Sequence, residues 1–275
     1  MLRFGFIIPF RPKSESNDWD EDNALLERTV SSVLRQTYPH LQVYVLYTDA
    51  PNKQLTDERL TYTAFPYGHQ SWDELQNRND LLLQFKSETK AIRRWDKARK
   101  LCYGSKLAKE ESCDYIMALD SDDLLSKHFL SYLVAKSQNK TCAGWYMEKG
   151  YLYKQGAGFL VRVPHYMFGL NGSTHVVRAD LVEIPDFSSL HWIDYSLFTD
   201  HGWVKERIGK YYNEMLEPVS RMMLVYVVHR SNMSKVDQKE YGFHLKAIVK
   251  RIFRSVALTK KLREEFNLLP DRVCQ

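Results

Sequence analysis

The 275-residue chain is long enough to bury a large core, as one α/β domain or as two closely fused halves. Hydrophobic residues make up 44% of the chain and charged residues 27%, which is ordinary for a globular protein. The sequence contains no run of about eighteen apolar residues that could span a membrane. The N-terminus is too short and too strand-like for a signal peptide, so we expect a cytoplasmic protein.

The formal charge of +5 is concentrated at the C-terminal end. Residues 235–275 contain ten Lys or Arg and five Asp or Glu, so the charges of residues 1–234 balance. A neutral body argues against nucleic acid as a partner. We expect helices over 240–258 and 259–269. Two interpretations of this basic segment stay open: a helix docked on the body, or peripheral contact with the inner face of a membrane.

The N-terminal region predicts a parallel βαβ unit. Residues 3–9 are almost continuously apolar, as in a strand buried on both faces, and residues 41–47 read as a second strand. Between them, apolar residues recur at helical spacing from Leu25 to Leu34. A strand, a helix and a strand in this order favour a parallel pair with a right-handed crossover.

A third apolar strand, 115–119, leads directly into the acidic run Asp120-Ser121-Asp122-Asp123. Ligands of open α/β sheets bind beyond the carboxyl ends of the strands. Carboxylates crowded there repel one another unless a cation lies among them. A divalent cation with few protein ligands commonly shares its shell with phosphate oxygens, so the run predicts a metal-diphosphate site.

The remaining elements are less regular. We expect a short strand over 60–65, helices over 72–86 and 96–110, and a helix after Asp123. From residue 142 the pattern changes to short strands and turns, over 144–147, 151–153 and 159–163, which indicates a meandering second half rather than more parallel sheet. We therefore divide the chain into residues 1–135, 136–234 and 235–275, with the first two fused into one continuous domain.

Three segments of the first half resemble the opening of the family 2 glycosyltransferases: Ile7-Ile8-Pro9, Ser32-Val33-Leu34-Arg35-Gln36-Thr37-Tyr38-Pro39 and Val43–Leu46. The resemblance implies the GT-A fold of that family. This is an α/β fold in which a Rossmann-like, mostly parallel central sheet carries helices on both faces. A smaller mixed sheet on the acceptor side and, in this chain, a C-terminal helical segment are fused to it.

The same resemblance implies a site for a nucleotide-diphosphate sugar. Asp122 would hold Mn²⁺ or Mg²⁺, Asp120 would contact the metal or the ribose, and Asp123 would cap the following helix instead. His229, after the apolar run 225–228, would complete the metal shell. The other expected donor contacts are Pro9, Arg11, Asp49, Lys97 and Ser121. The turn Asn171-Gly172-Ser173 would let the donor sugar approach the backbone, or is a plain turn into a strand.

The resemblance also implies a base that takes the acceptor's proton. Asp200 fits this position best, with Asp194 and His201 as rivals. The expected reaction is metal-dependent, inverting transfer to a hydroxyl of a glycan or lipid-linked saccharide in surface polysaccharide synthesis. A non-catalytic relative that binds nucleotide sugars or glycans is the alternative. A sugar-phosphate nucleotidyltransferase is disfavoured because the loop after residue 9 lacks glycines.

Overall fold

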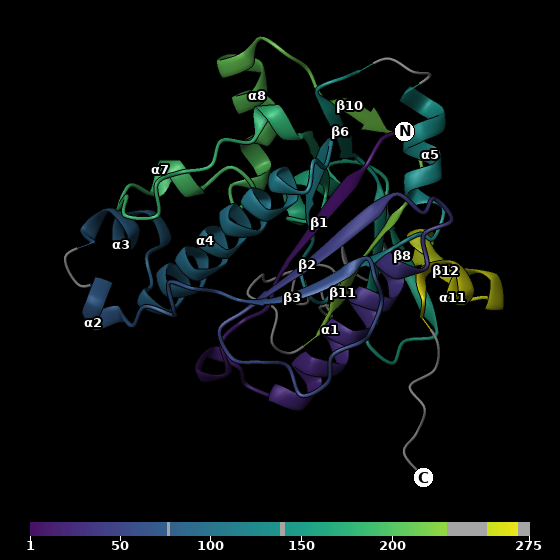
Figure 1. Ribbon diagram of the computed structural model, residues 1–275. Coiled ribbons are helices and arrows are strands. Elements are labelled where there is room, and N and C mark those ends of the chain that lie inside the picture. Colours follow the sequence, from purple (N-terminus) through teal and green to yellow (C-terminus); the bar gives the residue numbers. More distant parts are fainter. Residues whose placement is uncertain (76–77, 138–140, 230–251, 269–275) are drawn as a thin grey trace.

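The computed structural model describes residues 1–75, 78–137, 141–229 and 252–268. In these residues the strands form a seven-stranded main sheet and a five-stranded second sheet (Figure 1). The main sheet has the order β10-β6-β9-β4-β1-β2-β3. Its strands in chain order are β1 (Phe4–Pro9), β2 (Leu41–Tyr47), β3 (Leu60–Ala64), β4 (Tyr115–Ala118), β6 (Gly144–Met147), β9 (His175–Arg178) and β10 (Glu217–Val219).

The centre of the main sheet is parallel, as expected for a Rossmann-like arrangement. β1 pairs in parallel with β2 on one side and with β4 on the other, and β2 pairs in parallel with β3. Only β9 runs against its neighbours β4 and β6. All six residues of β1 are buried, because helices cover both faces of the sheet.

Two long helices cover opposite faces of β1, since successive strand residues point to opposite faces. Phe6 packs in one cluster with Leu26 of α1 (Trp19–Leu34), whereas Ile7 packs in another with Leu101 of α4 (Glu88–Glu110). α4 lies very close to the sheet at Gly104, where a Cβ atom would stand 2.3 Å from Ile7 Cγ2. The expected mostly parallel sheet with helices on both faces is therefore confirmed.

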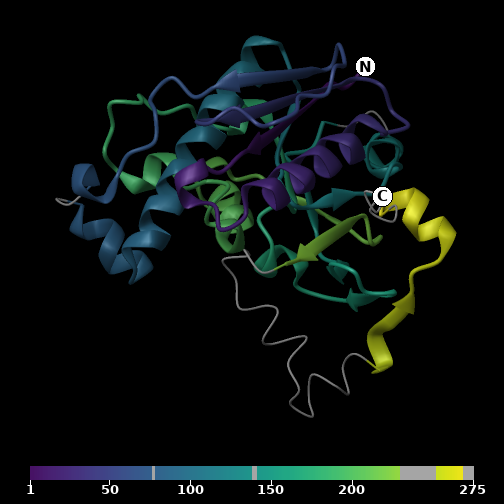
Figure 2. The same ribbon diagram turned by 90° about the horizontal axis from the view of Figure 1, so that it is seen from below.

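The second sheet has the order β12-β8-β7-β11-β5. Its strands are β5 (Leu124–Leu125), β7 (Gly150–Lys154), β8 (Phe159–Val163), β11 (Leu224–Val228) and β12 (Ser255–Ala257). Leu25 of α1 packs against Val225 and Val227 of this sheet, so α1 contributes to the cores of both sheets. Figure 2 shows the second sheet as a separate layer, with the C-terminal elements at its edge. The expected smaller mixed sheet is confirmed.

The two sheets do not divide the chain in sequence order. β6, β9 and β10 follow residue 135 but belong to the main sheet, and β5 precedes residue 135 but belongs to the second sheet. The expectation that the strand over 144–147 lies outside the main sheet was therefore wrong. It reaches that sheet through β9, which bridges β4 and β6 by antiparallel pairing.

Several helix boundaries differ from expectation. α4 starts at residue 88, not 96, and residues 72–86 form two short helices, α2 (Trp72–Leu75) and α3 (Asn79–Phe85). The acidic run leads into β5, so the next helix, α5 (Phe129–Ser137), starts later than expected. The short helices are α6 (Met167–Leu170), α7 (Trp192–Tyr195) and α8 (Val204–Tyr212), with 3-10 turns at Lys13–Glu15 (η1), Ala179–Leu181 (η2) and His201–Trp203 (η3).

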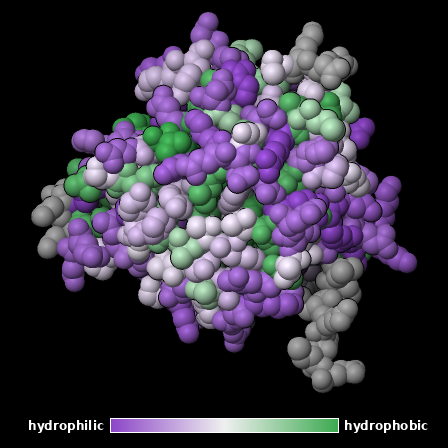
Figure 3. All heavy atoms as spheres, viewed as in Figure 1, coloured by the Kyte–Doolittle hydropathy of each residue, from purple (hydrophilic) through white to green (hydrophobic). Residues whose placement is uncertain are grey.

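The described part of the C-terminal segment docks on the body. The expected helix over 240–258 lies mostly outside the described residues, but its last part is wrong, because residues 255–257 form β12 and pair with β8. The second expected helix is confirmed as α11 (Lys260–Phe266), whose Phe266 is buried. Within the described ranges, no helix is long and apolar enough to cross a membrane. The face in Figure 3 shows apolar side chains only in small patches among hydrophilic ones.

Candidate functional site

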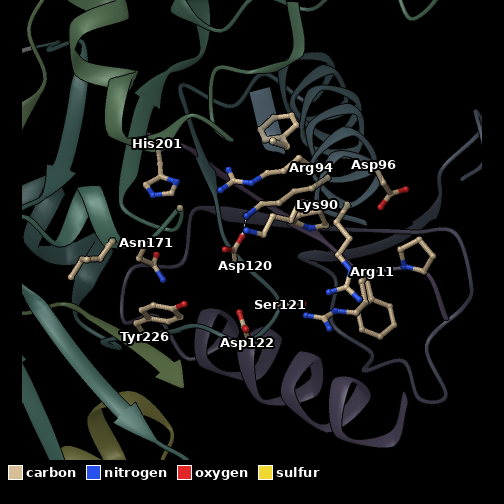
Figure 4. Close-up of a pocket in the computed structure, with 18 of the residues that line it drawn as sticks. Arg11, Lys90, Arg94, Asp96, Asp120, Ser121, Asp122, Asn171, His201 and Tyr226 are labelled. Atoms are coloured by element: carbon tan, nitrogen blue, oxygen red, sulfur yellow. Dashed lines mark ion pairs between the residues drawn. The ribbon is translucent and has the colours of Figure 1, made fainter. Parts of the chain in front are cut away.

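A cavity of about 380 Å³ lies beyond the carboxyl ends of β1 and β4, where the parallel sheet predicts a ligand site (Figure 4). The segments after the two strands form its floor, and the first turns of α4 form one wall. Nine of the residues singled out from the sequence line it: Pro9, Arg11, Lys97, Asp120, Ser121, Asp122, Asn171, Gly172 and His201. The other lining residues are Phe10, Pro12, Gln84, Phe85, Lys90, Arg93, Arg94, Asp96, Leu170 and Tyr226.

Asp122 and His229 meet at this cavity although 107 positions separate them in the chain. His229 Nε2 lies 2.8 Å from Asp122 Oδ2, and only 1% of the His229 side chain is exposed. β11 brings the imidazole here, because its first residues pair antiparallel with β5 and its later residues then run back along the acidic run that precedes β5. Burial alone would raise the pKa of the Asp122 carboxyl, but the hydrogen bond and charge of His229, with Arg11 and Lys97, lower it.

Asp123 is fully buried and does not cap a helix, contrary to expectation. Its Oδ2 accepts hydrogen bonds from Asn171 Nδ2 at 2.7 Å and from Ser173 Oγ at 2.6 Å. Its Oδ1 has no hydrogen-bond partner among the described residues. Burial, followed by the charges of Asp122 and Asp120, raises the pKa of this carboxyl well above its usual range. A buried carboxylate oxygen without a donor fits a bound cation.

The turn 171–173 also holds Asp120. The backbone amide of Asp120 donates to Ser173 Oγ at 2.8 Å, and the Asp120 side chain forms an ion pair with Lys97 Nζ at 2.5 Å. A Cβ atom on Gly172 would lie 3.4 Å from that ammonium and 3.5 Å from the carboxylate. The turn therefore packs directly on the ion pair, and the small residue at 172 keeps the cavity open there.

The acidic residues fit a divalent cation by their positions and their chemistry. One oxygen each of Asp120, Asp122 and Asp123 lies within 4.8 Å of the others. The imidazole of His229 contacts Asp122 and adds a nitrogen donor beside these carboxylates, and a mixed carboxylate and imidazole set suits Mn²⁺. Mg²⁺ would use the carboxylates and keep more water.

Four basic residues of α4 line the cavity: Lys90, Arg93, Arg94 and Lys97. Of these, only Lys97 was predicted from the sequence, because the helix was expected to start at residue 96. Their spacing of i, i+3, i+4 and i+7 places them on one helix face, and this is the signal that could have identified them. Arg93 is occupied by Glu15, whose carboxylate it contacts at 2.9 Å.

Arg11 supplies positive charge from the β1 side. Its Nε lies 3.6 Å from Asp22 Oδ2, which is a loose contact, and its buried Nη1 has no hydrogen-bond partner among the described residues. A guanidinium with an unused buried donor beside Asp122 is suited to phosphate oxygens.

Four of the residues predicted for the site lie outside the cavity lining: Asp49, Asp194, Asp200 and His229. Asp49, after β2, accepts a hydrogen bond from the backbone amide of Lys13 at 2.8 Å. Asp194 is exposed and accepts a hydrogen bond from Ser189.

Asp200 and His201 are neighbours in the chain but face different surroundings. Asp200 Oδ2 lies 3.3 Å from Trp192 Nε1 and is outside the cavity lining, and burial raises the pKa of its carboxyl. His201 lines the cavity. Burial, followed by the charges of Lys97 and Arg94, lowers the pKa of its imidazole to about 4, so that it is neutral near pH 7.

No protein-family model matches the sequence, and no curated protein sequence does. Among solved structures, residues 1–349 of TarS from S. aureus match 82% of this chain at 16% identity with a TM-score of 0.45. This chain spans 60% of the length of that structure. The complexes of TarS 1–349 with UDP and with UDP-GlcNAc match 96% and 92% of this chain, at 13% and 15% identity. This chain spans 75% and 67% of the lengths of those two structures, and the TM-scores are 0.45 and 0.44. At these identities and TM-scores the similarity concerns the general fold alone.

Proposed function

We propose that this protein is a metal-dependent glycosyltransferase that transfers a sugar, with inversion, from a nucleotide-diphosphate donor to a hydroxyl group. The observation that carries the proposal is the contact between Asp122, which lines a basic cavity, and the buried imidazole of His229 behind it. The family 2-like run Ser32–Pro39 supports the same assignment from the sequence.

The diphosphate of the donor is proposed to lie between Arg11 and the acidic run. Arg11 offers an unused buried N–H to a phosphate oxygen. Lys97 forms an ion pair with Asp120. When the Asp120 carboxylate binds the metal ion instead, the Lys97 ammonium becomes available to a phosphate oxygen. Asp122, Asp123 and His229 would hold the metal ion, with Asp120 facing the metal or the ribose.

A bound divalent cation would stabilise the negative charge that develops on the leaving diphosphate. The residues of the chain do the rest. Arg11 and Lys97 orient the phosphates, and the turn 171–173 fixes the acidic run and shapes the wall next to Asp120.

The proton of the acceptor is proposed to leave to the Asp200–His201 pair. His201 lines the cavity in the neutral form, which can accept a proton at Nδ1 or Nε2. The raised pKa of Asp200 makes it a stronger base than an ordinary carboxylate. Asp200 does not line the cavity, so the turn over 200–203 would have to move for it to reach the acceptor. Asp194 is exposed and is the least suited. The acceptor is proposed to be a glycan or a lipid-linked saccharide in surface polysaccharide synthesis.

The experiment that tests the proposal measures donor binding and donor cleavage. The full chain is incubated with UDP-, GDP-, ADP- and dTDP-sugars, with Mn²⁺ or with chelator, and released nucleotide is quantified while binding is followed by calorimetry. We expect metal-dependent binding of one nucleotide class and slow release of that nucleotide. Asp122→Ala should abolish both, whereas the control Asp180→Ala, near the end of β9 that pairs with the start of β4, should abolish neither.

The alternative outcomes are equally clear. Metal-dependent binding without release, with any acceptor saccharide tested, would indicate a binding protein rather than an enzyme. Absence of binding for every nucleotide sugar, with the protein folded, would overturn the proposed function.

A further inference from the structure

The cavity contains more positive charge than a metal-bound diphosphate needs. Of its five basic residues, Arg93 is paired with Glu15 and Lys97 with Asp120. The charge of a diphosphate and that of a divalent cation nearly cancel, and Arg11 faces Asp122. Lys90 and Arg94 are left without an acidic partner among the described residues.

The contacts of these two residues leave their charges available to a ligand. Arg94 Nη1 donates to the carbonyl oxygen of Thr199, which fixes the side chain but does not neutralise it. Lys90 is exposed at the cavity rim and makes no hydrogen bond or ion pair in the part of the chain that the structure describes. An oriented guanidinium beside a free ammonium can bind a phosphate or a carboxylate.

The position of Lys90 is also unfavourable for the helix. Lys90 lies in the first turn of α4, where the unpaired backbone N–H groups already give a partial positive charge, and Arg93 and Arg94 follow in the second turn. Acidic residues are favoured at such a place, and of the four residues Glu88–Ala91 only Glu88 is acidic. An anion bound among these basic side chains would offset their mutual repulsion and their repulsion with the helix N-terminus.

The pair faces a different part of the cavity from Arg11. Arg94 reaches the carbonyl of Thr199, two residues before His201, whereas Arg11 contacts Asp22 of α1. Figure 4 shows His201 and Arg11 on opposite sides of Asp120. A group bound by Arg94 and Lys90 would therefore lie toward His201, away from the phosphates proposed to bind Arg11.

We propose that Lys90 and Arg94 form a second anion-binding subsite, for a phosphate or carboxylate that a substrate carries in addition to the diphosphate of the donor. The inference rests on the proposed function, because it takes the diphosphate to bind elsewhere in the same cavity. The anion belongs either to the acceptor or to an acidic donor sugar. Experiments with free sugars and with nucleotide-linked sugars distinguish these two sources.

The test first fills the diphosphate position with Mg²⁺ and inorganic pyrophosphate, and it records their binding to the full chain by calorimetry. Glucose 6-phosphate, glucuronate and neutral glucose are then titrated against this complex, and binding is measured by saturation-transfer NMR. If the anion belongs to the acceptor, the two charged sugars bind beside pyrophosphate and glucose does not. If it belongs to the donor, nucleotide-linked glucuronate binds more tightly than nucleotide-linked glucose.

Variants assign the effect to the two residues. Lys90→Ala should weaken the charged ligand about threefold or more, as for an exposed ammonium, and Arg94→Gln about tenfold, as for a charged hydrogen-bonding group. Arg94→Lys should restore part of the loss. The control Lys106→Ala removes an exposed lysine of the same helix outside the cavity and should change nothing.

The proposal is overturned if glucose binds as well as its charged derivatives in both arms, or if Lys90→Ala and Arg94→Gln leave the preference for charge unchanged. It is also overturned if these variants weaken pyrophosphate itself to the same extent, since the pair would then serve the diphosphate. Failure of pyrophosphate to bind with Mg²⁺ would instead count against the proposed function.

Discussion

Asp123 and Ser173 form a 2.6 Å hydrogen bond in the interior, and through it the acidic run is tied to a turn fifty residues later in the chain. The same hydroxyl accepts from the backbone amide of Asp120 at 2.8 Å. One side chain therefore fixes two members of the acidic run relative to each other. Because β9 starts at residue 175, immediately after this turn, the main sheet sets the position of the whole arrangement.

Ser173→Ala is expected to separate the effect of this hydroxyl from the chemistry of the carboxylates. The substitution removes the hydrogen bond that Ser173 donates to the buried Asp123 carboxylate, and it leaves the backbone amide of Asp120 without its acceptor. These losses should lower the free energy of unfolding by about 1–3 kcal/mol. We also expect weaker Mn²⁺ binding in titrations followed by electron paramagnetic resonance. Ser131→Ala, at a partly exposed hydroxyl on α5, is the control and should leave both quantities near wild type. Wild-type Mn²⁺ affinity in Ser173→Ala would mean that the turn does not position the metal ligands.

His229→Ala is expected to weaken Mn²⁺ binding more than Mg²⁺ binding, because the imidazole favours the softer ion. The control His128→Ala removes an imidazole directly before α5, outside the lining of the cavity. Titration of each metal into wild type and both variants, with unfolding recorded in parallel, measures the preference. Equal losses for the two metals would argue that His229 only orients Asp122 through their 2.8 Å contact.

The base is expected to be revealed by separating donor binding from transfer. His201→Gln removes the imidazole that lines the cavity, and Asp200→Asn removes the carboxylate next to Trp192 while keeping its size. The variant that lacks the base should bind the donor with wild-type affinity and lose about 10²–10⁴-fold in transfer rate. Asp194→Asn tests the third candidate, and Asp180→Asn, at an exposed carboxylate outside the cavity lining, is the control. If both variants transfer at the wild-type rate, neither residue is the base.

The sequence could predict the elements that carry a strong local pattern. The apolar strands and the run Asp120–Asp123 predicted a site at the carboxyl end of β4, and the resemblance to family 2 glycosyltransferases pointed to His229. The start of α4 was missed although Ala91 and Trp95 extend the apolar face of the helix at helical spacing toward its N-terminus. The partners of Asp123 could not be predicted, since a buried polar contact between distant segments leaves no local pattern.

Gly104→Ala is expected to destabilise the fold by about 1–3 kcal/mol, as overpacking of a core does. The added Cβ would stand 2.3 Å from Ile7 Cγ2 and 2.8 Å from Leu46 Cδ2, so α4 would have to move away from the sheet. Gly158→Ala is the matched control, because nothing lies within 4 Å of a Cβ at that position. Urea unfolding of both variants measures the difference. Equal stabilities would show that the helix can shift without cost.

His175 is expected to make the stability depend on pH. Its imidazole is 1% exposed, and burial lowers its pKa from 6.5 to about 3. The unfolded chain therefore binds a proton that the folded chain does not, and stability should fall as the pH falls from 6.5 toward 3, by up to about 1.4 kcal/mol per pH unit. Urea unfolding between pH 7 and pH 5 should show a smaller loss for His175→Gln than for wild type. The exposed control His165→Gln should keep the wild-type slope, and parallel slopes in all three proteins would contradict the prediction.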